Sequence, residues 1–276
     1  MNQLYHRTRR NFGIVLVTVL LFNLACNDNG RQPQTESTRH TLKRLDRGDF
    51  ILKFNMDDEM SPIIKSRLTL SGELVSVIKQ LNDQFILPYD INITFQNIGE
   101  PNAYYDPTTK SVYFGYEFVN LFDKVFLSEY TTEEAWEASK NTVIFFLLHE
   151  LGHALVDVYK IPLNGNPEDV ADNFSINLLA ETSGINQAAI QGASFFQIFT
   201  KHEAEMKLQE LPVLDEHLLN AQRFHNIVCK LYGSDPVKYN FVVSGGYLDE
   251  TKSSRCAADY QSMKMAWERD LGPWLK

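Results

Sequence analysis

Residues 145–156 read Phe-Phe-Leu-Leu-His-Glu-Leu-Gly-His-Ala-Leu-Val, and the rest of the chain is interpreted around them. His149 and His153 stand four residues apart, so on a helix they point to the same side and can hold one ion between them. Glu150 follows the first histidine directly. Two neutral imidazoles and a carboxylate typically bind zinc with water in the fourth position, and a neighbouring carboxylate can accept a proton from that water.

The flanks of this motif predict where the helix lies. Residues 143–148 and 154–158 are mostly apolar, which is typical of a helix buried in a core. A buried helix rarely carries His, Glu and His together unless something satisfies their polar atoms. The alternative at this point is a pair of core histidines that are hydrogen-bonded to the backbone or to carboxylates.

The third ligand is expected from the next helix, which begins near Pro167 with acidic residues in its first turn. Glu168 and Asp172 are four residues apart and share a helix face. We expect Glu168 to ligate the metal and Asp172 to accept the outer N–H of a ligating histidine. Asp169 and Asp172 remain rival ligands, and these acids could instead only complement the helix dipole.

Hydrophobic periodicity predicts an α+β domain with a small mixed sheet and a mainly helical C-terminal half. A Thr-Thr-Glu-Glu sequence beginning at Thr131 predicts the start of the motif helix, which should run to about Tyr159. The other expected elements are strands over 48–54, 91–95 and 111–114 and a helix over 66–85.

The N-terminus predicts export. Residues 1–26 combine arginines, an apolar run and a small residue before Cys26, which resembles a bacterial lipoprotein signal with lipidation at Cys26. Ordinary signal cleavage is the alternative. Residues 27–47 are polar and are expected to tether a single domain, residues 48–276, to the membrane. The expected location is the bacterial cell envelope, with the protein lipid-anchored on the periplasmic side or at the cell surface.

Cysteine count and charge add two expectations. With Cys26 assigned to lipid, Cys229 and Cys256 are left as an even pair in an exported chain, which predicts a disulfide; two separate buried thiols are the alternative. The net charge is −9, and no basic cluster lies outside the leader and the tether, so nucleic acid is not expected as a partner.

The motifs together resemble a known zinc-peptidase arrangement. His149-Glu-x-x-His153 followed by Glu168-x-x-x-Asp172 is similar to the gluzincin pattern of thermolysin-like peptidases, whereas Val156 and Tyr159 exclude the metzincin pattern. The resemblance implies a zincin-like fold with one zinc ion per chain. Residues 102–114 resemble the Asn-Ala-aromatic hairpin whose edge strand binds substrate in those enzymes. By this resemblance the expected substrate-binding residues are Asn102, Ala103 and Tyr113.

Over nearly the whole domain the chain resembles a bacterial metallopeptidase family, the DUF4344-like domain of unknown function. The matching blocks are residues 99–107, 149–153, 168–172, 215–229 and 232–236. That family carries cysteines where this chain has Ile98 and Gly115, so the chain is expected to lack a second disulfide between the two strands.

The functional expectation is a zinc-dependent peptidase in which Glu150 activates water and an extended peptide adds beside the strand at 111–116. Its partners would be a peptide or protein substrate and the membrane. The candidate donors to the oxyanion are His217, which is preferred, and Arg223, His225 and Tyr247. One alternative is a non-catalytic, zinc-stabilised envelope protein that binds a partner through the aromatic hairpin, and another is hydrolysis of a different amide or an ester.

Overall fold

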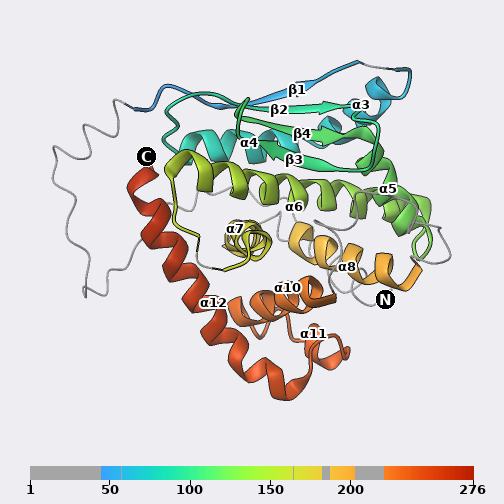
Figure 1. Cartoon of the computed structure of the whole chain (residues 1–276). Helices are drawn as coiled ribbons and strands as arrows, with labels where there is room; N and C mark the ends of the chain where they lie inside the picture. Colours follow the sequence, from blue (N-terminus) through green and yellow to red (C-terminus); the bar gives the residue numbers. More distant parts are fainter. Residues whose placement is uncertain (1–44, 57, 164, 182–186, 203–220) are drawn as a thin grey trace.

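The structure is a computed structural model and describes residues 45–276 except 57, 164, 182–186 and 203–220 (Figure 1). The expected leader with Cys26, most of the expected tether and His217 lie outside the described residues.

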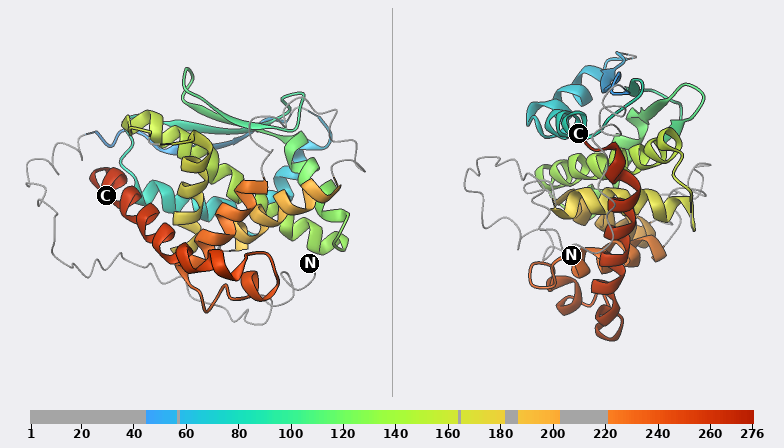
Figure 2. Two further views of the ribbon diagram at one scale, coloured as in Figure 1. Left: turned by 60° about the horizontal axis from the view of Figure 1, so that its bottom comes forward. Right: turned by 90° about the vertical axis from the view of Figure 1, so that its left-hand side faces the viewer.

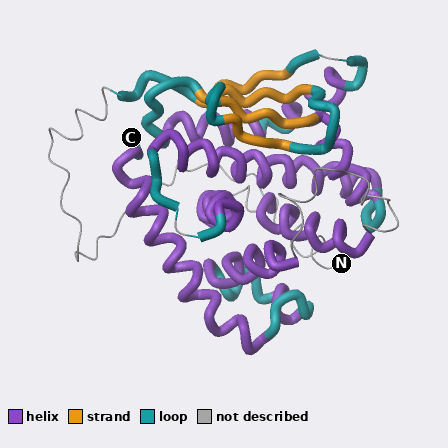
Figure 3. Tube along the Cα trace, viewed as in Figure 1, coloured by secondary structure: helices purple, strands orange, loops and turns teal. Residues whose placement is uncertain are grey.

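A four-stranded mixed sheet covers one side of the molecule (Figures 1 and 3). The strands have the order β1-β2-β4-β3, with β2 parallel to β1 and β4, and with β3 antiparallel to β4. The mixed sheet expected from the sequence is therefore confirmed. The strands are β1 (Phe50–Phe54), β2 (Ile91–Gln96), β3 (Ala103–Asp106) and β4 (Ser111–Gly115).

The strand order corrects one expectation. β4 pairs with β2 on one side and with β3 on the other, so no peptide can add beside residues 111–115. Among the described strands the edges belong to β1 and β3. The open edge of the hairpin therefore belongs to β3, which begins at Ala103.

The helix expected over 66–85 is two helices. They are α3 (Ser61–Leu70) and α4 (Glu73–Gln84), and Gly72 between them has a φ of 74°. Glycine adopts this left-handed conformation without a Cβ penalty, so the chain can turn here. A further helix, α5 (Tyr116–Leu127), was not expected; it follows β4 directly and buries seven side chains.

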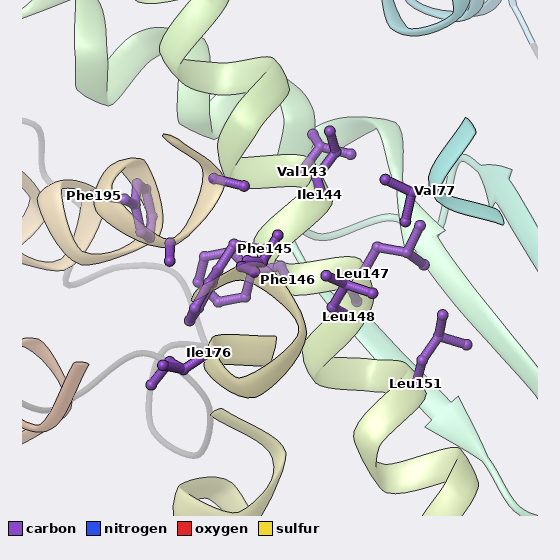
Figure 4. Packing of buried hydrophobic residues seen from close by; sticks show 14 of the residues in the cluster. Val77, Val143, Ile144, Phe145, Phe146, Leu147, Leu148, Leu151, Ile176 and Phe195 are labelled. Atoms are coloured by element: carbon purple, nitrogen blue, oxygen red, sulfur yellow. The ribbon is translucent and has the colours of Figure 1, made fainter. Parts of the chain in front are cut away.

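The central helix, α6 (Thr132–Tyr159), carries the His-Glu-x-x-His motif. It begins as predicted, with a capping box in which the Thr131 hydroxyl accepts from the Glu134 N–H while the Glu134 carboxylate accepts from the Thr131 N–H. By length and composition α6 could cross a membrane, but 78% of its most apolar window is buried inside the protein, as in a core helix. In Figure 4, Phe145 and Phe146 point toward the C-terminal helices, whereas Leu151 lies on the side of the sheet.

The helices of the C-terminal half pack beneath α6, on the side away from the sheet (Figure 2). Buried side chains from the sheet, from α6 and from these helices form one continuous hydrophobic cluster. The elements are α7 (Pro167–Glu181), α8 (Gln187–His202), α10 (Ala221–Ser234), α11 (Phe241–Ser244), α12 (Glu250–Leu271) and η3 (Gly272–Trp274).

Glycines let the helices approach α6 closely. A Cβ on Gly152 would lie 3.1 Å from Ala171 Cα, so α7 rests almost directly on the motif helix. A Cβ on Gly192 of α8 would lie 2.4 Å from the ring of Phe145. The close approach at Gly152 brings the first turn of α7 within reach of the two histidines.

Two of the expectations from the sequence concern disulfide bonds. The predicted disulfide is present: Cys229 of α10 and Cys256 of α12 are bonded, with an S–S distance of 2.03 Å. Ile98 and Gly115 are neighbours, since a Cβ on Gly115 would lie 2.9 Å from Ile98 Cγ1. An isoleucine side chain therefore fills the space where the family resemblance places a second disulfide.

Candidate metal centre

Three side chains from two helices converge at one point. His149 and His153 come from consecutive turns of α6, and Glu168 comes from the first turn of α7. The two Nε2 atoms are 3.2 Å apart, and the Glu168 carboxylate oxygens lie 3.2 Å from His149 Nε2 and 3.3 Å from His153 Nε2. Ligand atoms about 2.0–2.1 Å from a tetrahedral ion lie about 3.3 Å from one another. The residues present therefore fit one metal ion.

Asp172 holds the outer side of His149. Its Oδ1 lies 2.9 Å from His149 Nδ1, and both side chains are buried. This contact favours the tautomer with the proton on Nδ1, which leaves the Nε2 lone pair free for a metal. Burial lowers the pKa of His149, but hydrogen bonds to Asp172 and Glu168 outweigh burial and raise that pKa to about 9. An ion that binds at Nε2 therefore displaces a proton.

Arg223 of α10 lies behind Asp172. Its Nε and Nη2 donate to the two carboxylate oxygens of Asp172 at 2.8 and 2.6 Å, and its Nη1 lies 3.5 Å from Glu168 Oε2. Burial raises the pKa of Asp172, but the guanidinium charge and the hydrogen bond to His149 outweigh it and hold that pKa at about 2. The sequence suggested Arg223 only as an oxyanion donor, and its pairing with Asp172 was not expected.

Glu150 points into the same region from α6. Its side chain is 3% exposed, and its Oε1 lies 3.9 Å from His149 Nε2. Its Oε2 is buried and has no hydrogen-bond partner among the residues that the structure describes. A buried carboxylate oxygen is costly without a partner, so this atom is suited to accept a hydrogen bond from a small polar molecule beside the histidines.

The rival third ligand, Asp169, lies elsewhere. Its Oδ1 accepts from Asn226 Nδ2 of α10 at 3.2 Å, and it is not part of the His149, His153 and Glu168 group. The geometry therefore supports Glu168 as the ligand and Asp172 as the residue that holds His149.

The remaining oxyanion candidates are not brought to the group by any contact in the described residues. His225 is exposed and follows Arg223 by two residues, so on α10 it points about 200° away from it. Tyr247 packs near Phe224 instead, with ring centroids 6.4 Å apart. His217, the preferred candidate, lies outside the described residues.

The expected substrate residues lie in the hairpin. Asn102 and Ala103 stand at the start of β3, where the Asn102 side chain accepts from the Ala103 N–H at 2.9 Å. Tyr113 of β4 pairs with Tyr104, with ring centroids 5.4 Å apart. Since side chains alternate along a strand, these two rings occupy the face opposite Tyr105, which contacts α6. Tyr113 is therefore directed away from the helix that carries the histidines.

Comparisons with known proteins give one match. A family profile with the description "Putative metallopeptidase" (DUF4344) matches residues 55–271, which include β2, β3, β4, α6 and the helices from α7 to α12 but not β1. No curated protein and no solved structure gives a significant match.

Proposed function

This chain belongs to the Putative metallopeptidase family, and we propose that it is a zinc-dependent peptidase of zincin-like fold that uses Glu150 as general base. The observation that carries the proposal is the spacing of 3.2–3.3 Å between ligand atoms of His149, His153 and Glu168, beside a buried Glu150 oxygen that has no hydrogen-bond partner among the described residues. A purely structural zinc site would favour a fourth protein ligand and would need no base.

Zinc is the ion that two imidazoles and one carboxylate favour, and when bound it would polarise a peptide carbonyl and acidify a water molecule. His149, His153 and Glu168 would hold it. Asp172 and Arg223 keep His149 oriented, because the guanidinium fixes the carboxylate and the carboxylate fixes the ring.

Glu150 would carry the proton during hydrolysis. Its Oε2 accepts a proton from the attacking water and then donates it to the nitrogen of the leaving amine. Burial keeps bulk water from competing for this oxygen. We propose His217 as the donor that stabilises the oxyanion. Arg223 is less suited to this role because it already donates to Asp172.

The open edge of β3 is the proposed binding site for the peptide backbone. The Gly115 N–H donates to the Asn102 carbonyl, so Asn102 faces β4. Backbone groups alternate in an antiparallel pair, so those of Ala103 and Tyr105 are directed toward the open edge, where the Ala103 N–H already donates to the Asn102 side chain. An extended peptide could add here by strand augmentation. In this arrangement Asn102 and Ala103 contact the substrate.

The test is cleavage of a diverse peptide mixture by the zinc-loaded protein and by Glu150→Gln, with products identified by mass spectrometry. We expect the wild type to cut and Glu150→Gln to lose at least about a hundredfold in rate while it retains zinc. Equal cleavage by the two proteins would refute the role of Glu150. If neither protein cuts while zinc stays bound at one per chain, the non-catalytic binding protein becomes the better account.

A further inference from the structure

We propose that Asp157 is a positioning residue that fixes the edge strand β3 on α6 and thereby sets where a peptide docks relative to the metal residues. The proposal rests on the proposed function, since it concerns the same site. It concerns four residues, called the Asp157 node here: Tyr105, Lys110, Asp157 and Lys160.

The node joins the hairpin to the helix at one carboxylate. Asp157 Oδ2 accepts from the Tyr105 hydroxyl at 2.8 Å and from Lys110 Nζ at 2.6 Å. Asp157 Oδ1 accepts from Lys160 Nζ at 2.9 Å. Burial raises the pKa of Asp157, but Lys110, Lys160 and Tyr105 outweigh it and bring that pKa to about 2. Asp157 is therefore ionised at neutral pH and forms charge-assisted hydrogen bonds.

The node lies about one turn beyond His153 on α6, rotated about 40° from it around the helix axis, toward the hairpin. His149, His153 and Asp157 follow one another at intervals of four residues. A rigid helix therefore carries the metal residues and the anchor of the strand together. Any displacement of β3 relative to Asp157 is also a displacement relative to His149 and His153.

Asp157 holds the hairpin at two points, through Tyr105 and Lys110. Tyr105 belongs to β3 itself, and Lys110 ends the turn that joins β3 to β4. Lys110 has a φ of 53°, a left-handed conformation that is unusual for a residue with a Cβ. Its contact with Asp157 gives a reason for lysine at this position, where glycine would fit the backbone more easily.

Tyr105 connects the anchor directly to the proposed docking edge. Its hydroxyl is held by Asp157, while its backbone groups are directed toward the open edge. Substrate must be held close to the reacting geometry, and a misplacement of about 1 Å can cost about a hundredfold in rate. A loosened Tyr105 would therefore weaken peptide docking without removing any metal ligand.

The experiment compares Tyr105→Phe and Asp157→Asn with a matched control, Tyr104→Phe, which removes a hydroxyl from the same strand on the opposite face. The measurements are hydrogen exchange of the β3 amides, the zinc dissociation constant, and kcat and KM for a peptide that the wild type cleaves. In both node variants we expect β3 exchange to rise about tenfold and kcat/KM to fall about ten- to a hundredfold. Most of this fall should lie in KM, and zinc affinity should stay within about twofold. Tyr104→Phe should match the wild type.

Unchanged β3 exchange in the node variants would overturn the proposal, and so would faster exchange with an unchanged kcat/KM. A wild type that cuts no peptide would refute the proposed function and the docking role with it, while the exchange measurement would still decide whether Asp157 holds β3. Tyr105→Phe removes a single hydroxyl, so it carries the test if Asp157→Asn does not fold.

Discussion

Asp172 is a residue outside the proposed metal ligands that can control their chemistry. Its carboxylate accepts a hydrogen bond from the Nδ1–H of His149 and two hydrogen bonds from the Arg223 guanidinium. All three side chains are buried. The sequence placed Glu168 and Asp172 on one helix face, and the structure brings both to His149, because a spacing of four residues on a helix fixes which side chains share a face. It could not predict the partner of Asp172, because Arg223 is 51 residues away and only the packing of α10 on α7 brings it there.

The first prediction concerns Asp172→Asn, which loses the charge that pairs with Arg223 and weakens the hydrogen bond to His149. We expect zinc affinity to fall about 10- to 100-fold, measured by competition with a chromophoric chelator. Asp169→Asn is the matched control from the same turn of α7, and it should leave zinc affinity unchanged. A larger loss in Asp169→Asn than in Asp172→Asn would contradict the assignment of these two acids.

At the scale of helices and strands, the sequence predicted those features that depend on residues close together in the chain. The capping residues at Thr131 and Pro167 correctly predicted where α6 and α7 begin. The break at Gly72 was missed because an apolar pattern of helical spacing continues across it, whereas α5 was not among the expected elements although its buried residues have helical spacing. Which strand forms the edge of the sheet depends on pairing between distant segments. The expectation from the sequence therefore placed the docking edge at β4, whereas in the structure β3 is the edge strand.

A second prediction tests how tightly α8 packs on α6. Gly192→Ala would place a Cβ 2.4 Å from the ring of Phe145, so one of the two helices must shift. We expect the free energy of unfolding to fall by about 1–3 kcal/mol in urea denaturation. Gly272→Ala has open space around its Cβ and should change stability by less than about 0.5 kcal/mol. Equal stability of Gly192→Ala and wild type would show that this contact is looser than described.

A third prediction concerns the pH dependence of the contact between β3 and α6. The pKa of Asp157 is lowered from 3.8 to about 2 in the folded protein, so its ionised form stabilises the fold above pH 3.8 and this contribution disappears as the pH falls to about 2. Asp157→Asn should cost about 1–2 kcal/mol of unfolding free energy at pH 7, and the difference from wild type should shrink below pH 4. A difference that stays constant between pH 7 and pH 2.5 would contradict an ionic role.

At the scale of the whole molecule, a disulfide ties two helices of the C-terminal half to each other, and contacts at the end of the chain hold that half to the rest. The disulfide joins α10 to α12, and a Cβ on Gly233 would lie 2.0 Å from the Cys256 carbonyl oxygen, so these two helices are in close contact. At the end of the chain the Ile86 N–H donates to the Trp274 carbonyl, and the Trp274 ring stacks on Tyr159 of α6. The disulfide was predicted from cysteine parity together with the expectation of export, whereas the docking of the C-terminus was not predicted, because it depends on the assembled core.

The fourth prediction follows from the sequence separation of 27 positions between the two cysteines. Replacing Cys229 and Cys256 together by alanine should lower the free energy of unfolding by about 3 kcal/mol, since the unfolded chain gains conformational freedom. A reducing agent should lower the stability of the wild type but leave the double variant unchanged in urea denaturation. If the reducing agent affects neither protein, the two thiols are not bonded in the folded chain.

The most direct test of the central claim is an anomalous difference map recorded at the zinc edge on crystals of the zinc-loaded protein. We predict one peak per chain, about 2.0–2.2 Å from His149 Nε2, His153 Nε2 and a Glu168 carboxylate oxygen, with Glu150 close by but not bonded to the ion. A map with no peak among these three residues, or with zinc held by other side chains, would contradict the account.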